Sequence, residues 1–458
     1  MSSIHDFATW EPLLRLAWAS NAGTLAVPGG HAAGRIGRGY SSTSGPQRVL
    51  QPGHAAARVG DIPDEKDAVQ RVRDALADSG TDDIAYAAEI TASGSAVLHV
   101  INGSPAAEPG VADPHPGALI FVEGALPEPW RRLPDPVPGA APAPSADPAL
   151  VERALRERFP DAIGASEAEI AAAEARLGVA LPDELKALYR VTRARWEDWG
   201  EGDEAWWRVV EAVGCELLPL DEVYVADARS RLTPWRFAAM EAIEPRPGGA
   251  VQQLVGSPGW IVFGDADGSR IAVDLTPGPR GHVGQIIHVS HEDKVGAGLV
   301  ADSLADLVMH VDSTAPYGDR STEPSPVAHV NRVSLQSIEA AAHPGLEVLS
   351  IGVWDGEPFS LAAVLGLPRL RTLSAYPGTL ADPLEIAGLT GLEFLNLAPD
   401  DWRVLLDAGA VPRGLSAAAI EVRNDRHPLP VIDLANELLA LWDRPPITWT
   451  TLEGRLGE

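Results

Sequence analysis

The sequence predicts an α+β protein built from several domains, and three observations lead to this class. The chain has 458 residues, which at roughly 100–200 residues per domain is too long for one compact core. A proline-rich stretch near residue 140 separates segments that carry regular apolar periodicity. Leucines recur at a nearly constant interval in the last third of the chain, as in repeat proteins. Helices, strands and repeats are thus expected in separate parts of one chain.

Two changes in composition place the expected boundaries. Residues 133–148 read LPDPVPGAAPAPSADP, whose prolines oppose helix and strand interiors and favour a semi-rigid linker. Residues 312–327 read DSTAPYGDRSTEPSPV, where turn-forming residues replace periodic apolar ones. The expected parts are an N-terminal α+β domain of unknown role, a linker, a central domain, a second linker, a C-terminal repeat domain and a tail, over residues 1–131, 132–148, 149–311, 312–327, 328–443 and 444–458.

Charge and cysteine content limit the kinds of partner. The chain carries 36 Lys and Arg against 64 Asp and Glu, a net charge of −28, which opposes binding to nucleic acid or acidic membranes and favours basic partners. Cys215 is the single cysteine, so no internal disulfide can form, and ordinary packing is its expected role. The N-terminus shows no secretory signal, and no apolar run of about 18 residues suggests a membrane span. We expect a cytoplasmic protein.

The first segment combines a basic island with a small α+β pattern. Residues 21–60 hold four arginines and no acidic residue, and their glycines are not spaced as G-x-G-x-x-G, which favours a mobile loop over a phosphate site. Apolar spacing predicts a helix over 64–79. Strands are expected at 84–90, 96–101 and 118–122.

The central segment carries clear signals for two successive helices. Ser166 and Glu169 form an S-x-x-E capping box, so the first helix should start near Glu167, and Gly178 can close it in the left-handed conformation. Pro182 suits the first turn of the second helix. The expected buried face of that helix consists of Leu185, Leu188 and Tyr189.

The same segment shows a longer ordered pattern. Its members are Ile170, Glu174, Leu177-Gly178, Leu181-Pro182, Leu185 and Tyr189, followed by the apolar runs 217–220, 259–264, 271–275 and 284–287 and a terminal helix over 303–311. This order resembles the SUKH superfamily, Smi/Knr type, over about residues 152–311. The resemblance implies two starting helices packed against a curved antiparallel sheet. The family's Asn-Gly after the tyrosine is replaced here by RVTRARWEDWGEGDEAWW, so that loop has been rebuilt.

Two apolar runs, 260–263 and 271–275, flank the turn-rich interval 265–270 and predict a hairpin with Asp267-Gly268 at its turn. A calcium loop is the alternative there. It would need glycine at its sixth position and a carboxylate at its twelfth, where the chain has Arg270 and Thr276. A simple turn is therefore expected.

The third segment repeats a leucine pattern four times. The pattern L-x-x-L-x-[LIA] begins at Leu346, Leu370 and Leu392, and a degenerate copy begins at Leu415. This spacing resembles a short leucine-rich-repeat array, an α/β solenoid whose parallel strands expose alternate side chains; irregular α/β structure is the alternative. The row expected to be exposed consists of Val348, Ser350, Thr372, Ser374, Tyr376, Phe394, Asn396 and Glu421.

A cluster of tryptophans marks the rebuilt loop after Tyr189. Trp196, Trp199, Trp206 and Trp207 are interleaved with acidic residues that include Glu201 and Asp203. Tryptophan is favoured at the centres of protein interfaces, and surrounding carboxylates would steer a basic partner toward it. The alternative is that these rings cover the core of their own domain. The candidate partner-binding residues are Trp196, Trp199, Glu201, Asp203, Trp206, Trp207, Ser350, Thr372, Ser374, Tyr376, Phe394 and Asn396.

No hydrolase, nucleotide or zinc motif is found in the sequence, so we expect no enzymatic activity, cofactor or metal. His282, His288 and His291 are expected to be ordinary surface histidines. The family resemblance implies non-enzymatic binding, and in bacteria many such domains look like immunity proteins that neutralise toxins. The expected function is that of a bacterial immunity protein that blocks a toxin, possibly a basic nuclease. The alternative is a regulatory or scaffolding protein that uses the SUKH-like and repeat domains as docking surfaces.

Overall fold

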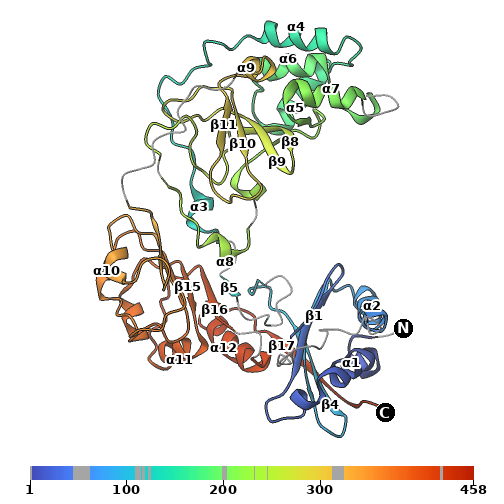
Figure 1. The fold of residues 1–458 in the computed structure, drawn as a ribbon, viewed down its shortest axis with the longest axis vertical. Coiled ribbons are helices and arrows are strands. Elements are labelled where there is room, and N and C mark those ends of the chain that lie inside the picture. The colour runs from blue at the N-terminus through green and yellow to red at the C-terminus, as the bar shows by residue number, and fades with distance from the viewer. Residues whose placement is uncertain are drawn as a thin grey trace. The chain divides into compact units, whose positions relative to one another are not determined.

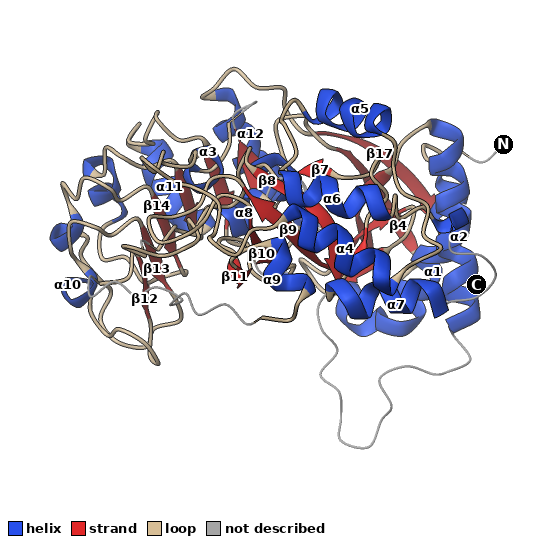
Figure 2. Cartoon of the chain, turned by 90° about the horizontal axis from the view of Figure 1, so that it is seen from above, coloured by secondary structure: helices blue, strands red, loops and turns tan. Residues whose placement is uncertain are grey.

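The computed structural model describes residues 3–44, 62–108, 115, 119–121, 125–198, 204–231, 233–244, 246–311, 324–422 and 426–457. They form two compact units (Figure 1), and helices and strands occur together in the described chain (Figure 2). The terminal unit comprises Met1–Ala125, Pro234–Arg236 and Ala328–Glu458, and the central unit comprises Leu126–Thr233 and Phe237–Val327. Both mix helices with sheets, as expected for an α+β protein.

The terminal unit contains a five-stranded antiparallel sheet in the order β17-β4-β3-β1-β2. Its strands are β1 (Ala32–Gly37), β2 (Ser41–Ser44), β3 (Asp83–Ile90), β4 (Ser95–Asn102) and β17 (Thr448–Arg455). Two helices, α1 (Phe7–Leu25) and α2 (Ile62–Ser79), pack on one face and enclose a core that contains Trp10, Tyr86 and Leu98 (Figure 1). Because β17 pairs with β4 along its full length, the last residues of the chain belong to the same sheet as the first.

The second sheet of the terminal unit has the order β12-β13-β14-β15-β16-β5. Its strands are β12 (Val327–Val330), β13 (Val348–Ile351), β14 (Thr372–Ala375), β15 (Phe394–Leu397), β16 (Ala417–Ile420) and β5 (Leu119–Phe121). Strands β13 to β16 are parallel and in register, while β5 is antiparallel to β16. Between successive strands lie α10 (Ile338–Ala341), η4 (Ala362–Val364), η5 (Pro383–Gly388) and α11 (Pro399–Asp407), and α12 (Pro428–Ala440) follows β16. Leu349, Leu373 and Leu395 point into one shared core with α12.

The terminal unit differs from several expectations. Part of the arginine-rich stretch forms the hairpin β1–β2, in which buried Arg35 pairs with Asp83, so the expected mobile loop is wrong for residues up to 44; residues 45–61 lie outside the described part. The predicted strand at 118–122 is present as β5 but pairs with β16 instead of the N-terminal strands. The expected C-terminal tail at 444–458 contains β17.

The central unit places helices on one side of a mostly antiparallel sheet. Its helices are α3 (Glu128–Arg131), α4 (Pro148–Arg158), α5 (Glu167–Leu177), α6 (Asp183–Val191), η2 (Trp196–Asp198), α7 (Glu204–Val213), η3 (Ala228–Arg231) and α9 (Leu304–Val308). The one-turn helix α8 (Trp235–Ala238) begins in the segment assigned to the terminal unit. The strands are β6 (Glu216–Leu217), β7 (Tyr224–Val225), β8 (Trp260–Ala266), β9 (Ser269–Asp274), β10 (Gln285–Val289) and β11 (Gly298–Ala301), in the order β11-β10-β9-β8-β6 with β7 also on β8. One core joins Ile170 and Leu188 of the helices to Phe263 of β8.

Local signals in the central segment are confirmed. Ser166 and Glu169 make both hydrogen bonds of the capping box, α5 starts at Glu167, and Gly178 closes it with φ +70°. The β8–β9 hairpin turns at Asp267-Gly268, where both φ angles are positive. The predicted linker 132–148 has no helix or strand before α4, yet its Ala141 carbonyl accepts a hydrogen bond from the Val283 N–H, so it lies against the loop that precedes β10. Most of the second predicted linker, 312–323, lies outside the described residues.

Candidate protein-binding surface

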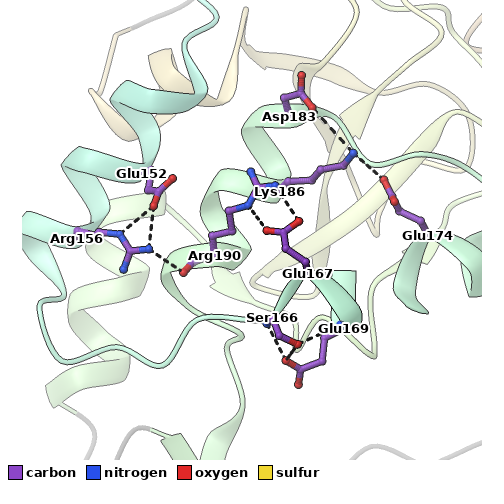
Figure 3. A network of polar contacts seen from close by, with 9 residues as sticks. All are labelled: Glu152, Arg156, Ser166, Glu167, Glu169, Glu174, Asp183, Lys186 and Arg190. Carbon is purple, nitrogen blue, oxygen red and sulfur yellow. Dashed lines mark hydrogen bonds and ion pairs between the residues drawn. The ribbon is translucent and has the colours of Figure 1, made fainter. Parts of the chain in front are cut away.

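Ion pairs join α5 and α6 of the central unit, and Arg156 of α4 donates to the Arg190 carbonyl of α6 (Figure 3). Arg190 of α6 binds both carboxylate oxygens of Glu167 on α5, at 2.6 and 3.1 Å. Lys186 of α6 pairs with Glu174 of α5 at 2.9 Å, and Glu174 also accepts the Leu181 N–H. The Glu174 carboxylate therefore closes the turn between the two helices.

A buried carboxylate lies beneath this layer. Glu184, 7% exposed, accepts the backbone N–H groups of Asp147, Leu304 and Ala305 at 2.9–3.1 Å. Burial raises its pKa, which the three N–H donors oppose. One side chain of α6 thus joins the starts of α4 and α9.

The chain leaves α6 through a segment that two arginines hold in place. Arg193 makes a two-pronged contact with Asp198, at 2.6 and 2.8 Å, and this contact lowers the pKa of Asp198. Arg195 reaches Asp221 at 3.4 Å. Between them Ala194 has φ +56°, a conformation that a non-glycine residue adopts only when its surroundings impose it. The segment is therefore held in one conformation by contacts on both sides.

This fixed segment presents tryptophan to solvent. Trp196 follows the two arginines directly and is 67% exposed. Trp207 on α7 is 58% exposed and lies edge-on against half-buried Trp206, with ring centroids 4.6 Å apart. The idea that these rings cover the domain's own core is thus wrong for Trp196 and Trp207. Trp199, Glu201 and Asp203 lie outside the described residues.

Exposed carboxylates occur near these rings in the sequence, together with Arg195 before Trp196 and Arg208 after Trp207. Glu197 and Glu211 are exposed beside Trp196 and Trp207 in sequence, and Glu216 is exposed at the start of β6. Carboxylates close to an exposed aromatic ring favour a partner that carries Lys or Arg near an apolar side chain. We call Trp196 and Trp207 with their acidic neighbours the tryptophan surface.

The expected row on the parallel strands is placed differently. Ser350, Ser374, Tyr376 and Glu421 are partly exposed, but Val348, Thr372, Phe394 and Asn396 are buried, so their expected exposure is wrong. Thr372 lies beneath the Arg371 side chain, and Phe394 is stacked with Trp235, a residue that the sequence reading had not singled out. A repeat pattern predicts on which side of the sheet a side chain lies, but it does not show whether another part of the chain covers that side.

Other groups considered in the sequence are structural. Cys215 is buried in the core, and burial raises the pKa of its thiol to about 12. His291 shares a hydrogen bond with Ser269, and no group of three or more His, Cys, Asp or Glu among the described residues is placed to hold a metal. Asp274 is fully buried, and burial raises its pKa to about 6 while Thr276 and Gln285 donate to it. Within the described residues, no helix is long and apolar enough to cross a bilayer.

Comparison with known proteins agrees with the fold of the central unit. Residues 164–310 match the model of the SMI1/KNR4 family (SUKH-1), so the chain contains a SUKH-1 domain and the resemblance is confirmed. A 62-residue part of the chain is 42% identical to a glucan synthesis regulatory protein of Neurospora crassa, covering 13% of this chain and 12% of that protein. A 122-residue part is 34% identical to the cell wall biosynthesis/cell cycle regulator smi1 of Schizosaccharomyces pombe, covering 26% and 21%. The chain thus spans only a small part of these relatives.

These relatives correct the functional expectation. Both are named as regulators, and neither is named as an immunity protein, so the expected neutralisation of a toxin is wrong. The expected bacterial source has no support from them either, because both are fungal. The regulatory alternative agrees better with the relatives.

Proposed function

We propose that this protein is a non-enzymatic regulatory protein that acts by docking another protein on its SUKH-1 domain. The observation that carries the proposal is the tryptophan surface: Trp196 remains in water on a segment that the Arg193–Asp198 ion pair holds in place, and Trp207 is exposed on α7. Binding is weakened by the conformational entropy that is lost when a mobile segment becomes ordered, and a segment that is already held in one conformation loses less. The regulator names of the two relatives support the class, and control of cell-wall or glucan synthesis is the first process in which to seek the partner.

The parallel strands support a second docking surface on the same chain. We take β13 to β16, with their short helical returns, as four units of a leucine-rich-repeat-like array. Neighbouring units are joined by a buried ion pair between Glu347 and Arg371, at equivalent places just before β13 and β14. A regulatory protein with two docking surfaces can bring two partners together.

The test is binding by the full-length protein. Its tagged form is used to recover partners from the lysate of its own cells, and the dissociation constant of each purified partner is then measured by calorimetry. Trp196→Ala/Trp207→Ala should lower the affinity for the regulatory partner at least about tenfold, as is typical when an interface tryptophan is removed. Because the chain carries a net charge of −28, association with a basic partner should also slow as salt rises.

A matched control variant distinguishes the loss of these two tryptophans from the loss of any exposed apolar side chains. Ile163 and Met309 are exposed apolar side chains of the same unit, at 48% and 46%, and Ile163→Ala/Met309→Ala should leave the affinity unchanged. Equal binding by the tryptophan variant and the wild type would refute the assignment of this surface.

A further inference from the structure

One side of the parallel sheet carries a hydrogen-bonded row of polar side chains. Ser374 of β14 and Asn396 of β15 are neighbours in register. The Asn396 Nδ2 donates to the Ser374 hydroxyl and to the Glu421 carboxylate, both at 3.0 Å. Asn396 is 6% exposed, and its Oδ1 has no donor among the described residues. The amide and the carboxylate thus lie together on one side of the sheet, where the Glu421 carboxylate can accept a further donor.

A short segment of the same unit lies on this row. The Trp235 ring is stacked with Phe394, with centroids 6.5 Å apart and planes 28° from parallel, and the backbone N–H of Trp235 donates to the Glu108 carboxylate at 3.0 Å. The Arg236 guanidinium pairs with Glu421, the carboxylate that Asn396 also binds. Trp235 is 7% exposed, so this contact removes nearly all of its ring from water. The row therefore receives an aromatic side chain followed by arginine.

We propose that Phe394, Asn396 and Glu421 form a docking site for an aromatic-arginine sequence in a partner protein, and that Trp235-Arg236 occupies this site in the chain itself. The inference deepens the proposed function, on which it rests, by naming the partner chemistry of the second docking surface. Tryptophan and arginine are the residues that most often dominate binding energy at interfaces. The acidic Glu421 matches the charge of the arginine.

Occupation by its own segment makes the site self-masking. A ligand tethered by a short stretch of chain has an effective concentration of about a millimolar, which a free partner must exceed. The apparent affinity for that partner is then reduced by the fraction of molecules in which the site is open. Removing the internal side chains should therefore strengthen binding, the reverse of what loss of an ordinary interface residue does.

The experiment uses full-length protein and a fluorescent peptide with the sequence of residues 232–238, LTPWRFA. Fluorescence anisotropy measures its binding to wild type and to Trp235→Ala/Arg236→Ala. We expect the variant to bind at least about tenfold more tightly than wild type, and the peptide in which alanine replaces tryptophan to bind at least about tenfold more weakly. Glu421→Gln in the unmasked variant should weaken binding severalfold.

Controls keep the outcome decisive. Arg236→Ala alone changes a side chain that is 38% exposed and should unmask the site in part if the double variant fails to fold. Trp449→Ala, at an exposed ring on β17, should change nothing. If a folded unmasked variant binds no tighter than wild type, or binds both peptides equally, the inference is overturned. Trp196→Ala/Trp207→Ala should not affect this peptide, so failure here and failure of the tryptophan surface are told apart.

Discussion

Replacing Arg371 with methionine should destabilise the terminal unit by about 3 kcal/mol. Glu347 is 2% exposed and Arg371 6%, and two guanidinium nitrogens of Arg371 lie 3.3 Å from one Glu347 oxygen. Breaking a buried ion pair costs about 3–5 kcal/mol because one charge stays buried without its partner. Arg369, which is half-exposed, still contacts the other Glu347 oxygen and partly balances its charge after Arg371 is removed. The expected loss of stability is therefore at the lower end of this range.

The same carboxylate supplies the control. Arg369 is 46% exposed, so Arg369→Met should cost only about 0–1 kcal/mol, although it removes a contact to the same group. Glu347→Gln/Arg371→Met removes both charges and should recover about 2 kcal/mol or more of the single loss.

Urea unfolding followed by far-UV circular dichroism measures these differences, with a second probe to test that the transition of the unit is two-state. In thermal melts, Arg371→Met should lower the melting temperature of the terminal unit by about 6–12 °C, at about 2–4 °C per kcal/mol for a unit of this size. Equal costs for Arg371→Met and Arg369→Met would show that burial does not set the strength of this network, and the reasoning would fail.

Three further changes test other parts of the structure. His427 accepts the Leu429 N–H at the start of α12, and its burial, together with the nearby His31, lowers its pKa to about 4. Because the pKa in the unfolded chain is about 6.5, the stabilisation from neutral His427 is complete above pH 6.5, and about 1–2 kcal/mol of it is lost as the pH falls toward 4. His427→Asn should therefore flatten the pH dependence of the urea midpoint. Gly178→Ala should cost the central unit about 1 kcal/mol in a thermal melt through backbone strain alone, since no atom lies within 4 Å of the added methyl; no change would contradict the left-handed cap. Glu184→Ala should cost at least about 3 kcal/mol in urea unfolding because three buried N–H groups lose their acceptor, and Glu184→Gln should cost less; equal losses would argue against this role.

The parts of the fold that the sequence predicted depend on neighbours in the chain. The capping box at Ser166, the cap at Gly178 and the turn at Asp267-Gly268 each involve residues within four positions of one another. Their conformations follow from local hydrogen bonds and from the backbone freedom of glycine. Such signals are readable wherever tertiary contacts do not oppose them.

The misplaced elements depend on partners far along the chain. Strand β17 pairs with β4 more than 300 residues earlier, and β5 pairs with β16 across a similar interval. A strand's alternation shows that it will join a sheet but not which edge it will join. The helix α1 was not predicted, although Trp10 and Leu14 place it firmly in the core; its Pro12 and weak amphipathic pattern obscure the signal.

Tryptophan shows why the candidate site could be read only in part. Trp402 is fully buried and its indole donates to the Ala419 carbonyl, whereas Trp196 is largely exposed. Sequence context distinguishes these cases: Trp402 lies on α11 with Leu405 three residues later on the same buried face, while Trp196 is flanked by arginine and glutamate. Trp235 also has an arginine beside it, yet it is buried, because Phe394 from a distant strand packs against it. The local sequence therefore distinguishes a core tryptophan such as Trp402 from Trp196 and Trp235. Whether one of these two is covered by a distant strand cannot be read from its neighbours in the sequence.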